Sequence, residues 1–224
     1  MPLINDYGAF LLSGLAVTLA LAAVSGVLAF CLGLGLVLLR MTRIRILQGL
    51  VAAFVEFQRN VPPLVHIFLW YFGVSSALPQ ALQDLANANH GEFWFACLAI
   101  GLYYAAYVAE HIRSGMRSIS GGQMEAARAL GLSHAGAMRR VMLPQALRAS
   151  IPPLTSEAVM LVKTTGLAMV LGVMELTYAV KDVASKSFRT FESYGIGTAL
   201  YVAVALVLLY TGSRLGRRLR IKGR

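Results

Sequence analysis

The sequence predicts an all-α membrane protein with five transmembrane helices, and three observations support this fold class. Of the 224 residues, 58% are hydrophobic, and the mean hydropathy is +0.67. Charged residues make up 13% of the chain, against about 25% in a typical soluble domain. The charge is unevenly distributed, since long stretches have none. This pattern indicates segments surrounded by lipid rather than one large soluble core.

Five segments are long enough to cross a bilayer, which takes about 20 mostly apolar residues. We place the spans at about 9–39, 48–74, 93–112, 153–173 and 194–215. The second is unusually polar, because it contains Glu56, Gln58, Arg59, Asn60 and the pair Pro62-Pro63. The amino terminus has no positive region and no small-residue cleavage site, so we expect the first span to remain in the mature protein. Residues 1–224 are predicted to form a single membrane domain without an internal repeat.

The distribution of basic residues predicts the orientation, because cytoplasmic loops are enriched in Lys and Arg. Three segments that fall on one side hold most of the 20 basic residues: Arg40, Arg43 and Arg45; Arg113, Arg117, Arg128, Arg139, Arg140 and Arg148; and Arg214, Arg217, Arg218, Arg220, Lys222 and Arg224. The other side has Lys181, Lys186 and Arg189, and residues 73–92 contain none. We therefore predict a periplasmic amino terminus and a cytoplasmic carboxy terminus.

Two other functions suggested by composition are not favoured. The net charge of +10 could indicate a nucleic-acid-binding protein, but the basic residues lie at the ends of apolar runs and no basic helix is interleaved with aromatic residues. We predict no nucleic-acid partner. Cys31 and Cys97 both lie in apolar runs and are interpreted as small hydrophobic residues. Neither a disulfide framework nor a metal site is predicted.

The cytoplasmic loop, residues 113–150, is predicted to be a helix-turn-helix. Ser120 and Gln123 have the spacing of a capping box, and residues 124–130 are strong helix formers. Gly131 can end this helix in the left-handed conformation. Ser133 is expected to cap a second helix that runs through Met142 and stops at Pro144.

The first of these helices has the composition of a docking surface. Ala126, Ala127 and Ala129 form a small-residue surface that another protein can approach closely, and Glu125 and Arg128 flank it with opposite charges. A solvated amphipathic connector would have the same composition, so composition alone leaves both interpretations open.

The loop resembles the EAA loop of ABC importer permeases. The family pattern is Glu-Ala-Ala, then Gly after three residues, then Ile-x-Leu-Pro. This chain has Glu125-Ala126-Ala127, Gly131 and Val141-Met142-Leu143-Pro144, with Val141 as a mild departure. The resemblance implies that the loop forms coupling helices that sit in a groove on a cytoplasmic ATPase subunit. The implied coupling residues are Glu125, Ala126, Ala127, Gly131, Leu143 and Pro144.

Similar stretches extend over nearly the whole chain. The run 59–65 is similar to the Arg-Asn-Thr-Pro-Leu-Leu-Val stretch of polar amino-acid permeases, and 107–110 and 113–115 resemble the end of their third helix. Pro152-Pro153, Glu157 and Lys163-Thr164 match their fourth. The resemblance implies a type I ABC importer permease fold of five spans. It also implies a polar amino-acid substrate, and PPLTSEAVMLVK looks most like the glutamate/aspartate permeases.

Charged groups inside spans mark a candidate substrate path, because each costs at least about 2.5–3.5 kcal/mol unless it is paired or hydrated. The candidates are Arg59, Asn60, Glu110, Glu157, Lys163 and Thr164. Glu157 and Lys163 lie about 120° apart around a helix, so we expect each to face another span or the cavity rather than its neighbour.

Each candidate also has a structural alternative. Lys163 either helps to form the path or makes an inter-span salt bridge. The family often has Asp-Thr-Ser after this lysine, and this chain has Thr164-Thr165-Gly166 instead. Arg59 either binds a substrate carboxylate beside the proline break or pairs with Glu56 or Glu110. His66 and His111 are interpreted as packed or interfacial residues rather than ligands. Tyr103, Tyr104 and Tyr107 are interpreted as part of an interfacial aromatic belt, with the alternative that a few of these aromatic residues line the path.

The implied function is alternating-access uptake of an amino acid, driven by a partner. No G-x-x-x-x-G-K-[ST] loop occurs, so ATP and Mg²⁺ are expected in the partner ATPase, and this chain is expected to have no cofactor and no catalytic residue. The other implied partners are a periplasmic binding protein, a second permease subunit and the lipid of the bacterial inner membrane. An intramembrane enzyme would need a catalytic set around Glu110 and Glu157, and no catalytic motif surrounds them. A channel or scaffold would not need a helix-turn-helix at EAA spacing.

Overall fold

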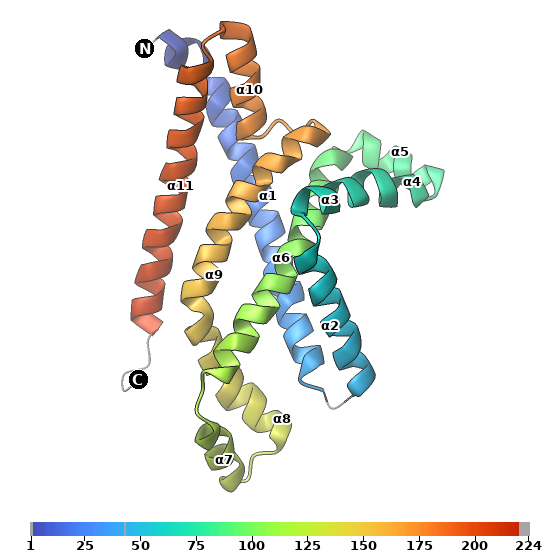
Figure 1. The fold of residues 1–224 in the computed structure, drawn as a ribbon, viewed down its shortest axis with the longest axis vertical. Helices are drawn as coiled ribbons and strands as arrows, with labels where there is room; N and C mark the ends of the chain where they lie inside the picture. The colour runs from blue at the N-terminus through green and yellow to red at the C-terminus, as the bar shows by residue number, and fades with distance from the viewer. Residues whose placement is uncertain (1, 43, 220–224) are drawn as a thin grey trace.

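The computed structural model describes residues 2–42 and 44–219, and all the regular structure in this part of the chain is helical (Figure 1). Arg43 and the tail residues Arg220, Lys222 and Arg224, which the orientation argument uses, lie outside the described residues. The α-helices are α1 (Pro2–Arg40), α2 (Arg45–Asn60), α3 (Pro63–Phe68), α4 (Ser75–Ala77), α5 (Gln80–Ala88), α6 (Gly91–Arg117), α7 (Gly121–Ala129), α8 (His134–Ala137), α9 (Leu143–Thr165), α10 (Leu176–Ser187) and α11 (Thr190–Leu219). Leu69–Val74 and Met138–Met142 are π-helical, and Gly166–Leu171 is a 3₁₀ helix.

Four helical segments in the described residues are long and apolar enough to cross a membrane. They are Leu3–Arg40, Gly91–Arg117, His134–Leu171 and Thr190–Leu219. The first, third and fifth predicted spans lie within these segments, which extend past the predicted bounds because helical structure continues through the polar residues at their ends. The fourth predicted span, 153–173, overlaps His134–Leu171, which begins earlier and ends two residues before the predicted bound.

The second predicted span, 48–74, is not one helix. The chain leaves helical geometry at Val61, which is extended with φ −104° and ψ 134°, and α3 then begins at Pro63. The cause is the pair of prolines, which lack a backbone N–H and exclude the preceding residue from the α conformation. The apolar helical stretch after the break, Pro63–Ala77, is shorter than the four spans, so the count of five spans stays a prediction.

The long helices pack around α6. α1 lies along α6, α6 lies along α9, and α11 contacts α9 and α10, while α2 and α3 cover another side of α6 (Figure 1). The main core lies between α1, α6 and α9, and includes Leu21, Ile100, Tyr104 and Leu161. A second apolar cluster joins α1 to α10. The polar candidate residues are therefore held on a small number of long, rigid helices.

The segments that connect the long helices lie at two opposite ends of the molecule, and the basic segments share one end, as the charge distribution predicts. The α1–α2 connection, α7, α8 and the carboxy-terminal end of α11 lie at one end, and the amino terminus and α10 lie at the other (Figure 1). The three basic segments thus share one end over their described residues. The compartment that this end faces stays a prediction.

The helix-turn-helix of the loop is present as α7 and α8, with one difference in capping. Gly131 has φ +86°, and Ser133 Oγ accepts a hydrogen bond from the Gly136 N–H at 3.1 Å, so both predictions are confirmed. The capping box is wrong: Ser120 is the N-cap of α7, but its side chain makes no capping hydrogen bond. The Gln123 side chain instead accepts a hydrogen bond from the Gln145 amide at 3.4 Å.

Pro144 does not end a helix. The π-helical turn Met138–Met142 leads directly into α9, in which Pro144 occupies the first turn. A proline is tolerated in the first turn of an α-helix, because the backbone N–H that it lacks has no intrahelical partner there. The wider π-helical turn before Pro144 allows α9 to begin at this point. The helix therefore continues from the loop into the bundle.

Candidate functional site

The coupling loop presents a narrower surface than its composition suggests. α7 and α8 extend from the end of the bundle (Figure 1). Glu125, Ala126 and Ala129 are exposed, but Ala127 is buried at 4% exposure. Ala126 and Ala129 are three residues apart and share one helix face, while Ala127 lies about 100° away, toward the bundle. Two of the three alanines thus belong to the open surface.

Leu130 was not singled out from the sequence, yet it is 86% exposed at the tip of the loop. Gly131 follows it with a positive φ and needs no side chain for packing, since an added Cβ would meet nothing within 4 Å. Leu143 and Pro144 lie half-buried at the base of the loop. The six predicted coupling residues therefore form an exposed tip and a packed base.

Glu157 and His111 form the central polar contact between α9 and α6. Their side chains are 21% and 28% exposed, and Glu157 Oε1 lies 3.0 Å from His111 Nε2. Glu157 thus faces another helix rather than Lys163, as predicted. His111 is more than the packed residue expected from the sequence, because it supplies the polar partner of an acid within a span.

A cluster of tyrosines continues this polar contact along α6. Tyr104 and Thr164 share a hydrogen bond of 2.7 Å between their hydroxyls, and the Tyr103 and Tyr107 hydroxyls lie 3.0 Å apart. The three tyrosine rings contact one another. We call Tyr103, Tyr104 and Tyr107 the tyrosine cluster. Its buried or half-buried hydroxyls are not those of a lipid-facing belt, which corrects the sequence interpretation.

Arg59 approaches the tyrosine cluster from α2. Its guanidinium carbon lies 5.6 Å from the centroid of the Tyr107 ring, within the range of a cation–π contact. The pairing partners proposed from the sequence are engaged elsewhere: Glu56 accepts hydrogen bonds from the Asn60 side-chain amide at 2.8 and 3.1 Å, one to its carbonyl and one to its carboxylate. Arg59 is exposed and forms no ion pair with a described residue.

Lys163 is the other free cation of the candidate path. It lies next to Thr164, its side chain is exposed, and it forms no ion pair within the described ranges. The structural alternative, a salt bridge to another span, therefore does not occur among the described residues. Met160 and Ser156, at helical spacing on the same side of α9, are also exposed, so Lys163 belongs to an open face of α9.

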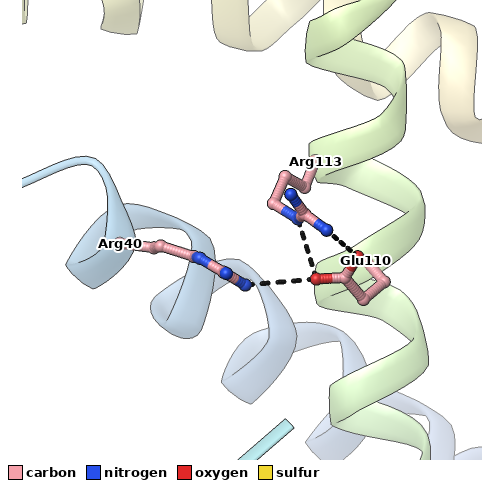
Figure 2. Close-up of polar contacts among 3 residues, drawn as sticks. All are labelled: Arg40, Glu110 and Arg113. Carbon is pink, nitrogen blue, oxygen red and sulfur yellow. Dashed lines mark hydrogen bonds and ion pairs between the residues drawn. The ribbon is translucent and has the colours of Figure 1, made fainter. Parts of the chain in front are cut away.

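Glu110 is held by two other arginines, and the positive charge of Arg59 also acts on its carboxylate from a longer distance. One of its oxygens accepts hydrogen bonds from Arg40 at 3.2 Å and from Arg113 Nε at 2.8 Å, and Arg113 also contacts the other oxygen (Figure 2). Arg40 ends α1 and Arg113 lies one turn along α6. The carboxylate therefore clamps the end of α1 to α6, and the structure does not bring it into contact with Glu157, Lys163 or Thr164.

His66 is a buried polar side chain that the sequence did not separate from ordinary packing. It is 1% exposed, and its ring contacts the rings of Phe57 and Tyr103 at centroid distances of 5.4 and 5.5 Å. Neither ring nitrogen has a hydrogen-bond partner among the described residues. His66 thus connects the proline break to the tyrosine cluster through ring contacts alone.

The fold and these sites define a membrane-embedded transport component of the binding-protein-dependent class. The family model for the binding-protein-dependent transport system inner membrane component matches residues 28–220, and the chain belongs to this family.

Characterised relatives place the chain more narrowly. It is 33% identical to the glutamate/aspartate import permease protein GltJ of Escherichia coli strain K12, over 98% of this chain and 91% of that protein. It is 35% identical to the octopine transport system permease protein OccM of Rhizobium radiobacter, over 88% and 81% of the two chains. It is also 36% identical to the probable glutamine ABC transporter permease protein GlnM of Bacillus subtilis, over 85% and 84%.

Solved structures agree with this assignment. An amino acid ABC transporter crystallised with histidines superposes with a TM-score of 0.84 at 31% identity, over 96% of both chains. The MetNI methionine ABC transporter has a TM-score of 0.76 at 20% identity, over 96% and 99%, and shows the shared type I fold. The chain is therefore a permease subunit of an ABC amino-acid importer, a transport component and not an enzyme.

Proposed function

We propose that this permease imports acidic amino acids, glutamate or aspartate, and the charge balance along the candidate path carries the proposal. Glu157 is paired with His111, and Glu110 is held by two arginines. Arg59 and Lys163 are exposed and form no ion pair in the described part of the chain. Unpaired cations beside a polar path attract a substrate with an additional carboxylate. The resemblance to the glutamate/aspartate permease of E. coli supports this substrate.

In this proposal the two cations act at different places. Arg59 lies against Tyr107, and the tyrosine cluster extends from there to Thr164, next to Lys163. A substrate carboxylate can exchange between the two cations along hydroxyl groups, which can hydrogen-bond it without holding it by charge. Thr164 and Asn60 are polar neighbours of Lys163 and Arg59.

The energy input is proposed to come through the coupling loop. A partner ATPase, which binds ATP and Mg²⁺, contacts the exposed surface of Glu125, Ala126, Ala129 and Leu130. Helical structure runs without interruption from His134 to Thr165, so a movement at the loop displaces the helix that carries Glu157 and Lys163. This continuous helical connection supports alternating access driven from the loop.

The remaining partners follow from the same class of machinery. A periplasmic binding protein delivers the amino acid, and a second permease subunit, identical or similar, completes the path. We place the assembly in the bacterial inner membrane, with the amino terminus periplasmic and the coupling loop cytoplasmic. The shared end of the basic segments supports this orientation (Figure 1).

The test is uptake of labelled amino acids into proteoliposomes that contain the permease, its ATPase and its binding protein, with ATP inside. We expect glutamate or aspartate uptake to exceed that of glutamine and arginine. Lys163→Met and Arg59→Met should each lower it about tenfold or more, because a hydrogen bond to a charged group contributes about 1.5–3 kcal/mol. Lys181→Met removes an exposed lysine of α10 and serves as the control.

Two results would contradict the proposal. One is uptake of a neutral or basic amino acid in preference to the acidic ones. The other is unchanged glutamate uptake by both path variants, at membrane levels equal to those of the Lys181→Met control.

A further inference from the structure

A groove lies between α9 and α11, at the end of the bundle that carries the coupling loop. Its volume is about 670 Å³, within the range of cavities that enclose small molecules. Its lining residues are Gln145, Arg148, Ala149, Pro152, Thr155, Ser156, Leu209, Gly212, Ser213, Gly216, Arg217 and Leu219. The six candidate path residues do not line the groove. Ser156, which does line it, lies on the same open face of α9 as Lys163.

Glycines on α11 shape this groove. A Cβ at Gly212 would lie 2.2 Å from Thr155 Cγ2, so Gly212 allows α11 to approach α9 closely. A Cβ at Gly216 would meet only Ile151 Cγ2, at 3.6 Å, which is an ordinary contact distance. The groove is therefore closed beside Gly212 and has free space beside Gly216.

The charged residues that line the groove are all basic. Arg148 on α9 and Arg217 on α11 both line it, both are exposed, and neither forms an ion pair with a described residue. No Asp or Glu is among its lining residues. Gln145, Ser156 and Ser213 add polar groups, while Pro152, Leu209 and Leu219 supply apolar surface.

We propose that this groove binds an anionic phospholipid, with the phosphate of the headgroup between Arg148 and Arg217 and an acyl chain along Pro152 and Leu209. Basic pockets between transmembrane helices recognise anionic headgroups on the cytoplasmic side. A free phosphate ion would use the two arginines but leave the apolar length of the groove uncovered. A lipid satisfies both parts of the surface, and it would hold α11 against the helix that leads to the coupling loop.

The experiment uses the full-length permease purified with its ATPase in detergent, stripped of lipid and titrated with phosphatidylglycerol or phosphatidylcholine. Native mass spectrometry counts the retained lipids. We expect the wild type to retain phosphatidylglycerol in preference to phosphatidylcholine. The double variant Arg148→Gln/Arg217→Gln should bind it at least about tenfold more weakly. Arg148→Lys/Arg217→Lys, which keeps the charge, should lose less.

The matched control is Arg214→Gln/Arg218→Gln, which removes the same charge from α11 at positions that do not line the groove. Its affinity should stay within about twofold of the wild type. Gly216→Leu tests the groove without a change of charge, since the side chain would fill free space, and it should also weaken binding.

Several outcomes would overturn the inference. Equal losses in the two double variants would show attraction by general charge, and equal retention of the two lipids would show no headgroup recognition. Full competition by inorganic phosphate would assign the arginines to a free anion. Retention of no lipid by the wild type, or undiminished binding by Gly216→Leu, would remove the groove as the site.

Discussion

Gly33 of α1 lies so close to Val108 of α6 that a Cβ added to the glycine would be 2.7 Å from Val108 Cγ1. The same Cβ would lie 2.9 Å from the backbone oxygen of Ala105. In a membrane, helices associate through van der Waals packing, and small residues let their backbones approach. Gly33 is therefore the point at which the first helix of the chain is fixed to the helix that carries the tyrosine cluster.

Replacement of Gly33 by alanine should separate these two helices. We expect a loss of about 1–3 kcal/mol in the free energy of unfolding, as for other overpacked cores. Gly35 lies two residues further along α1, and a Cβ there would meet nothing within 4 Å. Gly35→Ala should be neutral or stabilise by about 0.5–1 kcal/mol, because alanine is the better helix former. The stability of both variants can be measured from their unfolding in denaturing detergent, monitored by circular dichroism. Equal stabilities of the two variants would contradict the close packing at Gly33.

Removal of the charge of Glu110 should destabilise the chain more than removal of one of its arginines. Glu110→Gln leaves Arg40 and Arg113 near each other without a common anion, whereas Arg40→Gln leaves the contact between Glu110 and Arg113 intact (Figure 2). We expect about 1–3 kcal/mol for Glu110→Gln, the range for loss of charged hydrogen bonds, and less for Arg40→Gln. The same unfolding measurement gives the free energy of unfolding of each variant. A larger loss of stability with Arg40→Gln than with Glu110→Gln would show that the clamp does not depend on the carboxylate.

Glu175 should be a determinant of stability at the opposite end of the bundle. It is fully buried, and its carboxylate accepts hydrogen bonds from the backbone N–H groups of Thr177 and Tyr178, each at 2.8 Å. It also accepts one from the Tyr201 hydroxyl of α11 at 3.0 Å. Glu175→Ala should cost at least about 2 kcal/mol, since it removes an N-cap and the acceptor of the buried Thr18 hydroxyl, which donates to Glu175 Oε2 at 3.3 Å.

Glu175→Gln is the informative comparison, because the amide oxygen can still accept from the first turn of α10. We expect it to retain more than half of the stability that Glu175→Ala loses, measured by thermal unfolding of the purified protein. If alanine proves as stable as the wild type, the carboxylate does not hold α10 in place.

The conformation of Gly131 allows a test of the coupling loop that leaves its surface intact. Gly131 has φ +86° and open space around it. A larger residue at this position is therefore disfavoured only by the backbone conformation and not by a steric clash. Gly131→Ala should weaken retention of the ATPase about fivefold to thirtyfold, because the left-handed conformation costs about 1–2 kcal/mol for an L-residue. Gly131→Asn should retain more of the binding, since asparagine tolerates this conformation.

The measurement is co-purification of the ATPase with the permease at matched membrane levels. Gly121→Ala is the control, because a Cβ at that position also meets nothing within 4 Å and Gly121 begins α7 without a positive φ. A loss of ATPase with Gly121→Ala as large as that with Gly131→Ala would show that the left-handed turn is not the cause.

Local patterns in the chain were sufficient for some of the predictions that depend on neighbouring residues, but not for the capping box at Ser120. The left-handed turn at Gly131 and the cap at Ser133 are local, and the structure confirms both. Pro62-Pro63 breaks the second segment, as proline chemistry requires. The prediction that a helix ends at Pro144 was wrong. Proline ends a regular α-helix, but here a π-helical turn precedes it, and that turn could not be inferred from residue types.

The candidate path shows the corresponding limit for side chains. The sequence placed Glu110 and Glu157 in one group, because both are acids within apolar helices. In the structure Glu110 pairs with Arg40 and Arg113, whereas Glu157 pairs with His111. His111 lies only one residue from Glu110 in the chain, so no rule of spacing separates their partners. The hydrogen bond of the tyrosine cluster to Thr164 was also missed, since it forms only when α6 packs against α9.

By itself the sequence determined that this chain is a helical membrane protein, where its long helices lie, and where the chain turns in the loop between the third and fourth of the predicted spans. These properties follow from transfer of side chains to lipid and from backbone preferences, which act over a few residues. The tertiary structure alone decided which charges are compensated and which stay free. That outcome depends on which faces of α1, α6, α9 and α11 pack together. Residues as far apart in the chain as Thr18 and Leu176, which are separated by 158 positions, become hydrogen-bond partners only through that packing.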